Sequence, residues 1–172
     1  MKKSRVNTRF LVKSAVIAAL YAVMTAALAP ISYGMVQCRV SEALCVLCAF
    51  TPAAVPGLTA GCLIANMFSF NPIDMLFGTL ATLIAAICAR RLRNVRFHGI
   101  AWLVPLPAVL VNMLVVGLEL AIYCPLEGKS FLLGFLIQAL AVGAGQIVAC
   151  YVLGVPLYAL INRTPLKKLI EE

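Results

Sequence analysis

Four charged residues stand within or beside the apolar runs of this sequence, where an ionised group costs at least about 2.5–3.5 kcal/mol near the middle of a membrane. Arg39 and Glu42 are three positions apart, so a helix places both on one face. Two interpretations stay open: the pair neutralises itself and orients the preceding loop, or one member contacts a ligand. Asp74 and Glu119 have no cation near them in the sequence, so contact with a ligand and pairing within the protein are equally supported for each.

Side-chain amides accompany these charges. Asn112 and Glu119 are seven residues apart, so one helical face presents both. Amides in membrane helices also form helix-to-helix hydrogen bonds, and that alternative stays open for each of them. The predicted site is a polar cavity at the outer end of the molecule, roofed by residues 31–38. Its candidate residues are Tyr33, Gln37, Arg39, Glu42, Asn71, Asp74, Asn112, Glu119 and Gln138.

The sequence gives little support for a catalytic site. Gly128-Lys129-Ser130 resembles the end of a phosphate-binding loop, but Tyr123 stands where that motif requires glycine. The one histidine, His98, lies in an arginine-rich loop rather than beside a nucleophile. Cys45 and Cys48 form a CxxC pair without further ligands, so a zinc or redox site is not indicated. We expect no metal, no cofactor and no catalytic residue.

The composition is that of an integral membrane protein. Of 172 residues, 63% are hydrophobic and 12% are charged, against roughly 25% charged in soluble domains. The net charge of +8 gathers at the ends and in one loop, as membrane orientation requires, so no nucleic-acid partner is expected. The basic and apolar N-terminus resembles a signal peptide, but Pro30 would follow the cleavage position, which favours a retained first helix.

Apolar runs predict six spans in one membrane domain, residues 1–172. A span needs about 20 residues, so the short second and third runs could instead form one kinked helix. Six spans leave only Arg39 and Lys129 of the fourteen Lys and Arg residues outside, and merging the short pair would place most of them outside. The sequence therefore predicts an all-α bundle with both termini in the cytoplasm. Its approximate spans are 10–29, 40–50, 53–68, 73–90, 100–123 and 131–161.

Two short features refine this prediction. Thr51 is expected to cap the third helix with Pro52 in its first position, and Gly143, Gly145 and Pro156 are expected to bend the last one.

The first helix carries small residues four apart, a spacing that lets another helix approach closely. Those residues, Ala15, Ala18, Ala19 and Ala22, either pack within the bundle or dock a partner subunit.

Three segments together resemble the QueT family: VNTRFLVKSAVIAALYAV, APISYGMVQCRVSEAL and FTPAAVPGLTAGCLIAN. The most specific part is ISYG followed by Gln37, Arg39, Ser41 and Glu42, and the likeness covers nearly the whole chain. Members of the family are substrate-capture (S) subunits of energy-coupling factor (ECF) transporters for queuosine precursors.

The resemblance implies a six-helix S-subunit bundle in the bacterial cytoplasmic membrane. It implies a site for a 7-deazaguanine near the outer surface, docking of the alanine stripe on a T subunit, and ATP hydrolysis by two partner ATPases. Three alternatives remain: an S subunit for another heterocyclic vitamin, a self-sufficient oligomeric channel or carrier, and a structural membrane protein.

Overall fold

The computed structural model describes residues 7–32, 39–68, 72–97 and 99–171. Within these ranges the chain is helical, and the one β-type contact is an isolated bridge between Phe97 and Ile100. The predicted all-α class is therefore confirmed. The elements are α1 (Thr8–Ala27), α2 (Ala29–Ser32), the 3-10 helix η1 (Val40–Ala49), α3 (Ala54–Met67), α4 (Pro72–Arg91), the 3-10 turn η2 (Leu92–Asn94), α5 (Leu106–Tyr123), α6 (Phe131–Ile147), the π-helical segment η3 (Val148–Leu153), α7 (Gly154–Arg163) and α8 (Leu166–Glu171).

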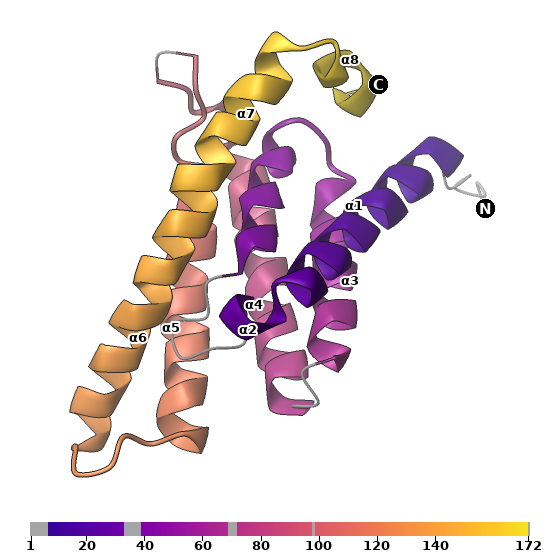
Figure 1. The fold of residues 1–172 in the computed structure, drawn as a ribbon. Coiled ribbons are helices and arrows are strands. Elements are labelled where there is room, and N and C mark those ends of the chain that lie inside the picture. The colour runs from indigo at the N-terminus through magenta and orange to yellow at the C-terminus, as the bar shows by residue number, and fades with distance from the viewer. Residues whose placement is uncertain (1–6, 33–38, 69–71, 98, 172) are drawn as a thin grey trace, which may run out of the picture.

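The long elements form one bundle in which successive elements run in opposite directions (Figure 1). Neighbours in the bundle are α1 with α3, α3 with α4, α4 with α5, and α5 with α6. The short helix η1 occupies the centre, and each residue from Ser41 to Ala49 is buried. Because of the alternation, the start of α1 and the helix α8 lie at the same end of the bundle.

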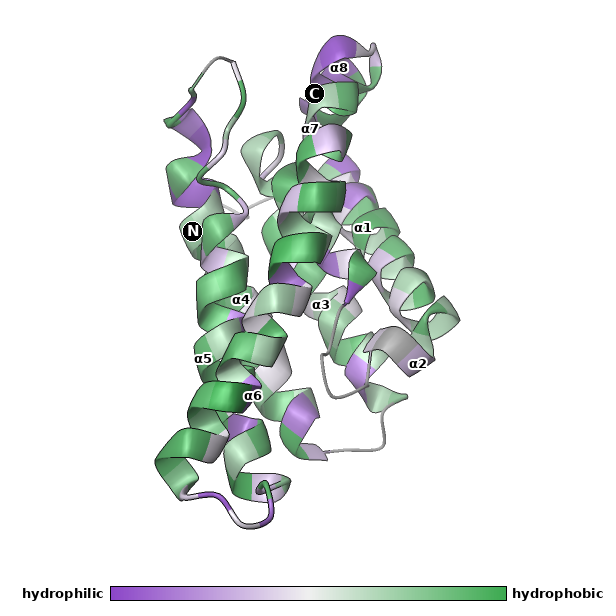
Figure 2. Ribbon diagram, turned by 60° about the vertical axis from the view of Figure 1, so that its left-hand side comes forward, coloured by the Kyte–Doolittle hydropathy of each residue, from purple (hydrophilic) through white to green (hydrophobic). Residues whose placement is uncertain are grey.

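In the described part of the chain, four helices are long and apolar enough to cross a membrane: Thr8–Ala27, Pro72–Asn94, Leu106–Tyr123 and Phe131–Arg163. Hydrophobic residues cover their lengths, and hydrophilic residues gather at the loops and helix ends (Figure 2). The segments Val40–Ala49 and Ala54–Met67 are apolar but shorter. This surface suits a membrane-embedded protein, whereas the count of six crossings and the side of the termini stay predictions.

Close packing of α1 on α3 depends on two glycines four residues apart. A Cβ atom on Gly61 would lie 2.7 Å from Cβ of Tyr21 and 2.8 Å from the carbonyl oxygen of Ala18. Gly57 approaches Ile17 and the carbonyl of Ser14 in the same way. Small residues at this spacing let two helix backbones touch in a membrane.

The predicted alanine stripe divides between two faces of α1. Ala18 and Ala22 are buried in the bundle, while Ala15 and Ala19 are exposed. Ala18 and Ala22 therefore pack within the bundle, which was one of the two predicted alternatives. A docking role stays a prediction, and only the exposed two can carry it here.

The short second and third runs are separate helices rather than one kinked helix. The chain reverses direction between η1 and α3 (Figure 1). The predicted cap is displaced, because α3 begins at Ala54 and not at Pro52. The Thr51 hydroxyl still accepts a hydrogen bond from the backbone N–H of Ala53 at 3.3 Å.

Two long spans differ from the prediction. One begins later than expected, and the other has its irregular turn at a different place. α5 begins at Leu106 rather than near residue 100, since a residue that precedes proline, here Val104, disfavours the helical conformation. The last span is continuous, and its irregular turn is the π-helical Val148–Leu153 rather than a bend at Gly143 or Gly145. Pro156 lacks the N–H that would bond the carbonyl of residue 152, and the π-helical turn lies just before it.

Candidate functional site

A buried ion pair joins the start of η1 to the first turn of α4. Arg39 Nη2 donates to both carboxylate oxygens of Asp74, at 2.9 and 2.7 Å. Both residues are almost fully enclosed, with 3% and 5% of their surface exposed. One guanidinium nitrogen thus contacts both carboxylate oxygens, and these charge-assisted contacts hold the guanidinium in place. The interpretation in which Arg39 pairs directly with Glu42 is therefore wrong, although the Arg39 charge still acts on Glu42.

Glu42 instead takes its direct contacts from α1 and α4. The Tyr21 hydroxyl donates to Glu42 Oε1 at 2.5 Å, and the Thr82 hydroxyl lies 3.5 Å from the same oxygen. All three side chains are buried. Since these contacts come from within the bundle, Glu42 ties η1 to its neighbouring helices.

A second ring of contacts holds the ion pair in place. Asn66 Nδ2 donates to the backbone carbonyl of Asp74 at 3.0 Å. The thiol of Cys62 lies 3.8 Å from Arg39 Nη1 and 3.2 Å from the Thr82 hydroxyl. Gly78 leaves room for these groups, because a Cβ there would lie 2.7 Å from Asp74 Oδ1 and 2.9 Å from Asn66 Nδ2. The end of α3, the start of α4 and the start of η1 therefore form one polar cluster.

A further carboxylate, Glu119 on α5, lies beside this cluster. It is 7% exposed, and it interacts electrostatically with Asp74 and Arg39. Its Oε2 atom is buried and accepts no hydrogen bond from any described residue. Asn112, two turns earlier on α5, is also buried, and its Nδ2 has no acceptor among the described residues. A buried polar atom without a partner is expensive, so these atoms indicate a missing partner.

Gln138 on α6 adds a further unused acceptor at the same end. Its Nε2 donates to the backbone carbonyl of Cys124 at 2.9 Å, which ties α6 to the end of α5. Its Oε1 is buried with no donor among the described residues. Gln146, deeper on α6, lies against the thiol of Cys150 at 3.6 Å and belongs to the bundle interior.

The structure thus brings four predicted residues together at one end of the bundle, namely Arg39, Glu42, Asp74 and Glu119. Asn112 is buried two turns nearer the start of α5, and Gln138 lies on the adjacent α6. The other predicted residues, Tyr33, Gln37 and Asn71, lie outside the described residues.

The sequence analysis missed several members of the cluster. Tyr21 stands alone as a polar aromatic in an alanine-rich helix, which was a usable signal. Thr82 and Gly78 follow Asp74 at eight and four residues, so the helical period places all three on one face. Cys62 and Asn66 are four apart on α3 and share a face for the same reason.

The described part of the site has no metal-ligand set. Described His, Cys, Asp and Glu residues form no group of three or more that could hold a metal ion. A cavity of about 820 Å³ lies at the opposite end, between α1, η1, α7 and α8. The chemistry that the cluster offers is recognition, with a carboxylate and two amides for a polar ligand.

Comparison with known proteins gives two matches. The family model described as QueT transporter matches residues 11–163. A protein named queuosine precursor transporter QueT, from Lactococcus lactis subsp. cremoris (strain MG1363), is 43% identical over 86 residues, which are 49% of this chain and 50% of that protein. The match thus spans about half the length of this curated relative. No solved structure matches the chain.

Proposed function

This chain belongs to the QueT transporter family, and we propose that it captures a queuosine precursor for an ATP-driven importer of the ECF type. The name of the Lactococcus lactis relative supports the substrate class. The observation that carries the proposal is Glu119, a buried carboxylate with an unused oxygen beside the Arg39–Asp74 pair.

The chemistry of a 7-deazaguanine complements these unused atoms. Its ring N–H and exocyclic amine are parallel donors that one carboxylate accepts together, and Glu119 takes that role. Its carbonyl oxygen needs a donor, which Asn112 Nδ2 offers. Gln138 Oε1 remains as an acceptor for a further N–H of the ligand.

The balance of buried charge favours a ligand that carries positive charge. The cluster holds one cation, Arg39, and three carboxylates, Glu42, Asp74 and Glu119. Asp74 is neutralised by Arg39, and Glu42 is hydrogen-bonded by Tyr21 and Thr82. We therefore expect a precursor with an aminomethyl group to bind more tightly than a neutral one of the same ring.

The orientation follows from the position of the cations. The ends of α4 and α7 and the helix α8, opposite the site, hold Arg90, Arg91, Arg163, Lys167 and Lys168. Cytoplasmic ends of membrane proteins keep Lys and Arg, so the site faces outward and both termini face the cytoplasm. Six crossings of the bacterial cytoplasmic membrane are consistent with the alternating directions of the elements.

Energy comes from partner subunits in this proposal. The sequence holds no complete phosphate-binding loop, so ATP would be hydrolysed by two ATPases. Ala15 and Ala19 lie exposed on α1 and would meet the T subunit.

Titration of the purified full chain with 7-aminomethyl-7-deazaguanine, its 7-cyano analogue and queuine tests the substrate class. Glu119→Gln should weaken binding of the preferred compound roughly 10- to 150-fold, the range for a hydrogen bond to a charged group. The control is Glu127→Gln, since Glu127 is an exposed carboxylate in the loop that follows α5. Absence of binding across the three compounds would reject the substrate class.

Reconstitution separates the proposal from a self-sufficient carrier. Liposomes that contain this chain alone should bind the substrate without accumulating it, and addition of T subunit, ATPases and ATP should start uptake. Uptake by the chain alone would favour the carrier and reject the ECF assembly.

A further inference from the structure

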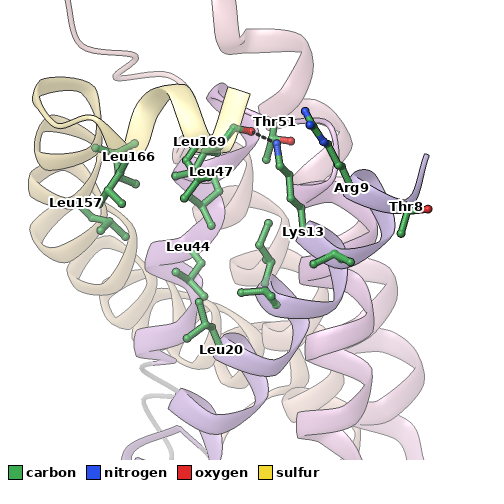
Figure 3. Close-up of a pocket in the computed structure, with 15 residues that line it drawn as sticks. Thr8, Arg9, Lys13, Leu20, Leu44, Leu47, Thr51, Leu157, Leu166 and Leu169 are labelled. Carbon is green, nitrogen blue, oxygen red and sulfur yellow. Dashed lines mark hydrogen bonds between the residues drawn. The ribbon is translucent and has the colours of Figure 1, made fainter. Parts of the chain in front are cut away.

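An apolar groove opens at the end of the bundle opposite the site (Figure 3). Its volume is about 820 Å³, within the roughly 300–1,000 Å³ range of ligand pockets. On α1 it is lined by Val12, Val16 and Leu20, which recur every four residues along one face. η1 contributes Leu44 and Leu47. The remaining apolar lining comes from Ile17 of α1 and from Leu157, Ile161, Leu166, Leu169 and Ile170 of α7 and α8.

Polar residues line this groove at its terminal end, and the charged ones are cations. Arg9 is exposed, and Lys13 is half-buried with its Nζ donating to the backbone carbonyl of Ile170 at 3.0 Å. Neither forms an ion pair with any described carboxylate. Figure 3 shows both beside Thr8 and Thr51. An ammonium group has three donors, so Lys13 keeps two for another acceptor.

We propose that this groove binds one anionic phospholipid, with an acyl chain along α1 and η1 and the phosphate at Arg9 and Lys13. The charge of the groove complements that ligand, because its body is apolar and its mouth is cationic. Basic pockets between membrane helices bind acidic headgroups, and each Lys or Arg near an anionic surface is worth about a fivefold gain in affinity. A partner helix of purely apolar character would not need the two cations.

Native mass spectrometry of the purified full chain with phosphatidylglycerol tests the proposal, and phosphatidylcholine with the same acyl chains is the reference lipid. The wild-type chain should retain one phosphatidylglycerol at least roughly tenfold more tightly than phosphatidylcholine. Arg9→Gln with Lys13→Gln should weaken that binding roughly 30-fold and reduce its dependence on salt. The matched control is Arg91→Gln with Arg93→Gln, one exposed and one half-buried cation away from the groove.

A second pair of variants tests the apolar part. Val16 lines the groove and is 53% exposed, so Val16→Trp should fill the groove and abolish tight retention without disturbing the core. Val23, on α1 but outside the groove and 65% exposed, gives the control Val23→Trp, which should bind as the wild type does. Unchanged elution in size-exclusion chromatography verifies that each variant is folded.

Three results would overturn the proposal. The first is equal retention of the two lipids by the wild-type chain. The second is displacement of phosphatidylglycerol by millimolar glycerol phosphate, which would make the mouth a plain anion site. The third is unchanged lipid binding in Val16→Trp together with failed assembly with the T subunit, which would assign the groove to a protein helix.

Discussion

The buried charges of this protein divide into structural and available groups. Arg39 and Asp74 form a buried ion pair, and Glu42 is hydrogen-bonded by Tyr21 and Thr82. Glu119 has an oxygen that no described residue uses. Mutations in the first group should therefore act on stability, and those at Glu119 on ligand binding.

Asp74→Asn should destabilise the fold by about 3–5 kcal/mol, because it removes the charge opposite a buried guanidinium. Thermal unfolding of the detergent-solubilised protein would show this as a lower Tm. The double variant Arg39→Gln with Asp74→Asn should recover part of the loss, since no uncompensated charge remains. A Tm equal to that of the wild type in the single variant would contradict the pairing.

Tyr21→Phe should cost about 1–3 kcal/mol, the penalty for removing one partner of a buried hydrogen bond. The same unfolding measurement applies, and the control is Tyr123→Phe, whose side chain is exposed. Substrate affinity of the folded Tyr21 variant should stay within about threefold of the wild type. A selective loss of affinity without loss of Tm would place Glu42 in the ligand site instead.

Residue types in the sequence predicted the polar cluster, but not its pairing. Glu42, Asp74 and Glu119 were expected at the same end because the six-span topology puts each of them on the outer side, and the structure places them together. The partner of Arg39 could not be found by spacing, since Asp74 is 35 residues away on α4 and meets Arg39 only through the packing of α4 against η1. Local helical geometry favoured Glu42, and tertiary packing overrode it.

At the level of elements, the tight contact between α1 and α3 positions Tyr21 over Glu42. Gly57 and Gly61 permit that contact, because a Cβ at either position would lie within 2.9 Å of an α1 atom. The helix that presents the exposed Ala15 and Ala19 is thereby held against the helix that ends beside the site.

Gly61→Ala should lower the Tm, because the added methyl group must push α1 away from α3. The matched control is Gly134→Ala on α6, where a Cβ would meet no atom within 4 Å. That control should be neutral or stabilising by up to about 1 kcal/mol, the helix-propensity gain of alanine over glycine. Equal effects of both substitutions would show that the glycines of α3 do not limit the helix approach.

The apolar runs of the sequence predicted where the helices lie, but they did not predict the local helix geometry. α1 and α4 begin within two residues of the predicted spans, because long apolar segments leave little freedom of placement. The 3-10 form of η1 and the π-helical Val148–Leu153 depend on how neighbouring helices pack, which no hydrophobic pattern encodes. The start of α5 was misplaced because Pro105 and Pro107 lie inside an apolar run.

On the scale of the whole molecule, the two ends of the bundle differ in chemistry. One end holds the carboxylates and amides of the site, and the other holds the cations and the apolar groove. The proposed membrane orientation rests on this asymmetry, since membrane proteins keep their basic ends in the cytoplasm. The exposed Cys124 at the end of α5 marks the site end.

In intact cells that express the chain with Cys38→Ser, a membrane-impermeant maleimide should label Cys124 from outside, and the further change Cys124→Ser should remove that labelling. In the Cys124→Ser background, Arg163→Cys at the end of α7 should be labelled only after the membrane is permeabilised. The reverse pattern would place the site in the cytoplasm.

The Arg39–Asp74 pair also constrains how the protein is made. Arg39 leaves the ribosome 35 residues ahead of Asp74, and the whole of α3 is synthesised between them. Until Asp74 arrives, the guanidinium can stay solvated only at the water-facing surface of the bilayer. We therefore expect Arg39 to reach its buried position only after α4 has been inserted, when Asp74 becomes available to pair with it.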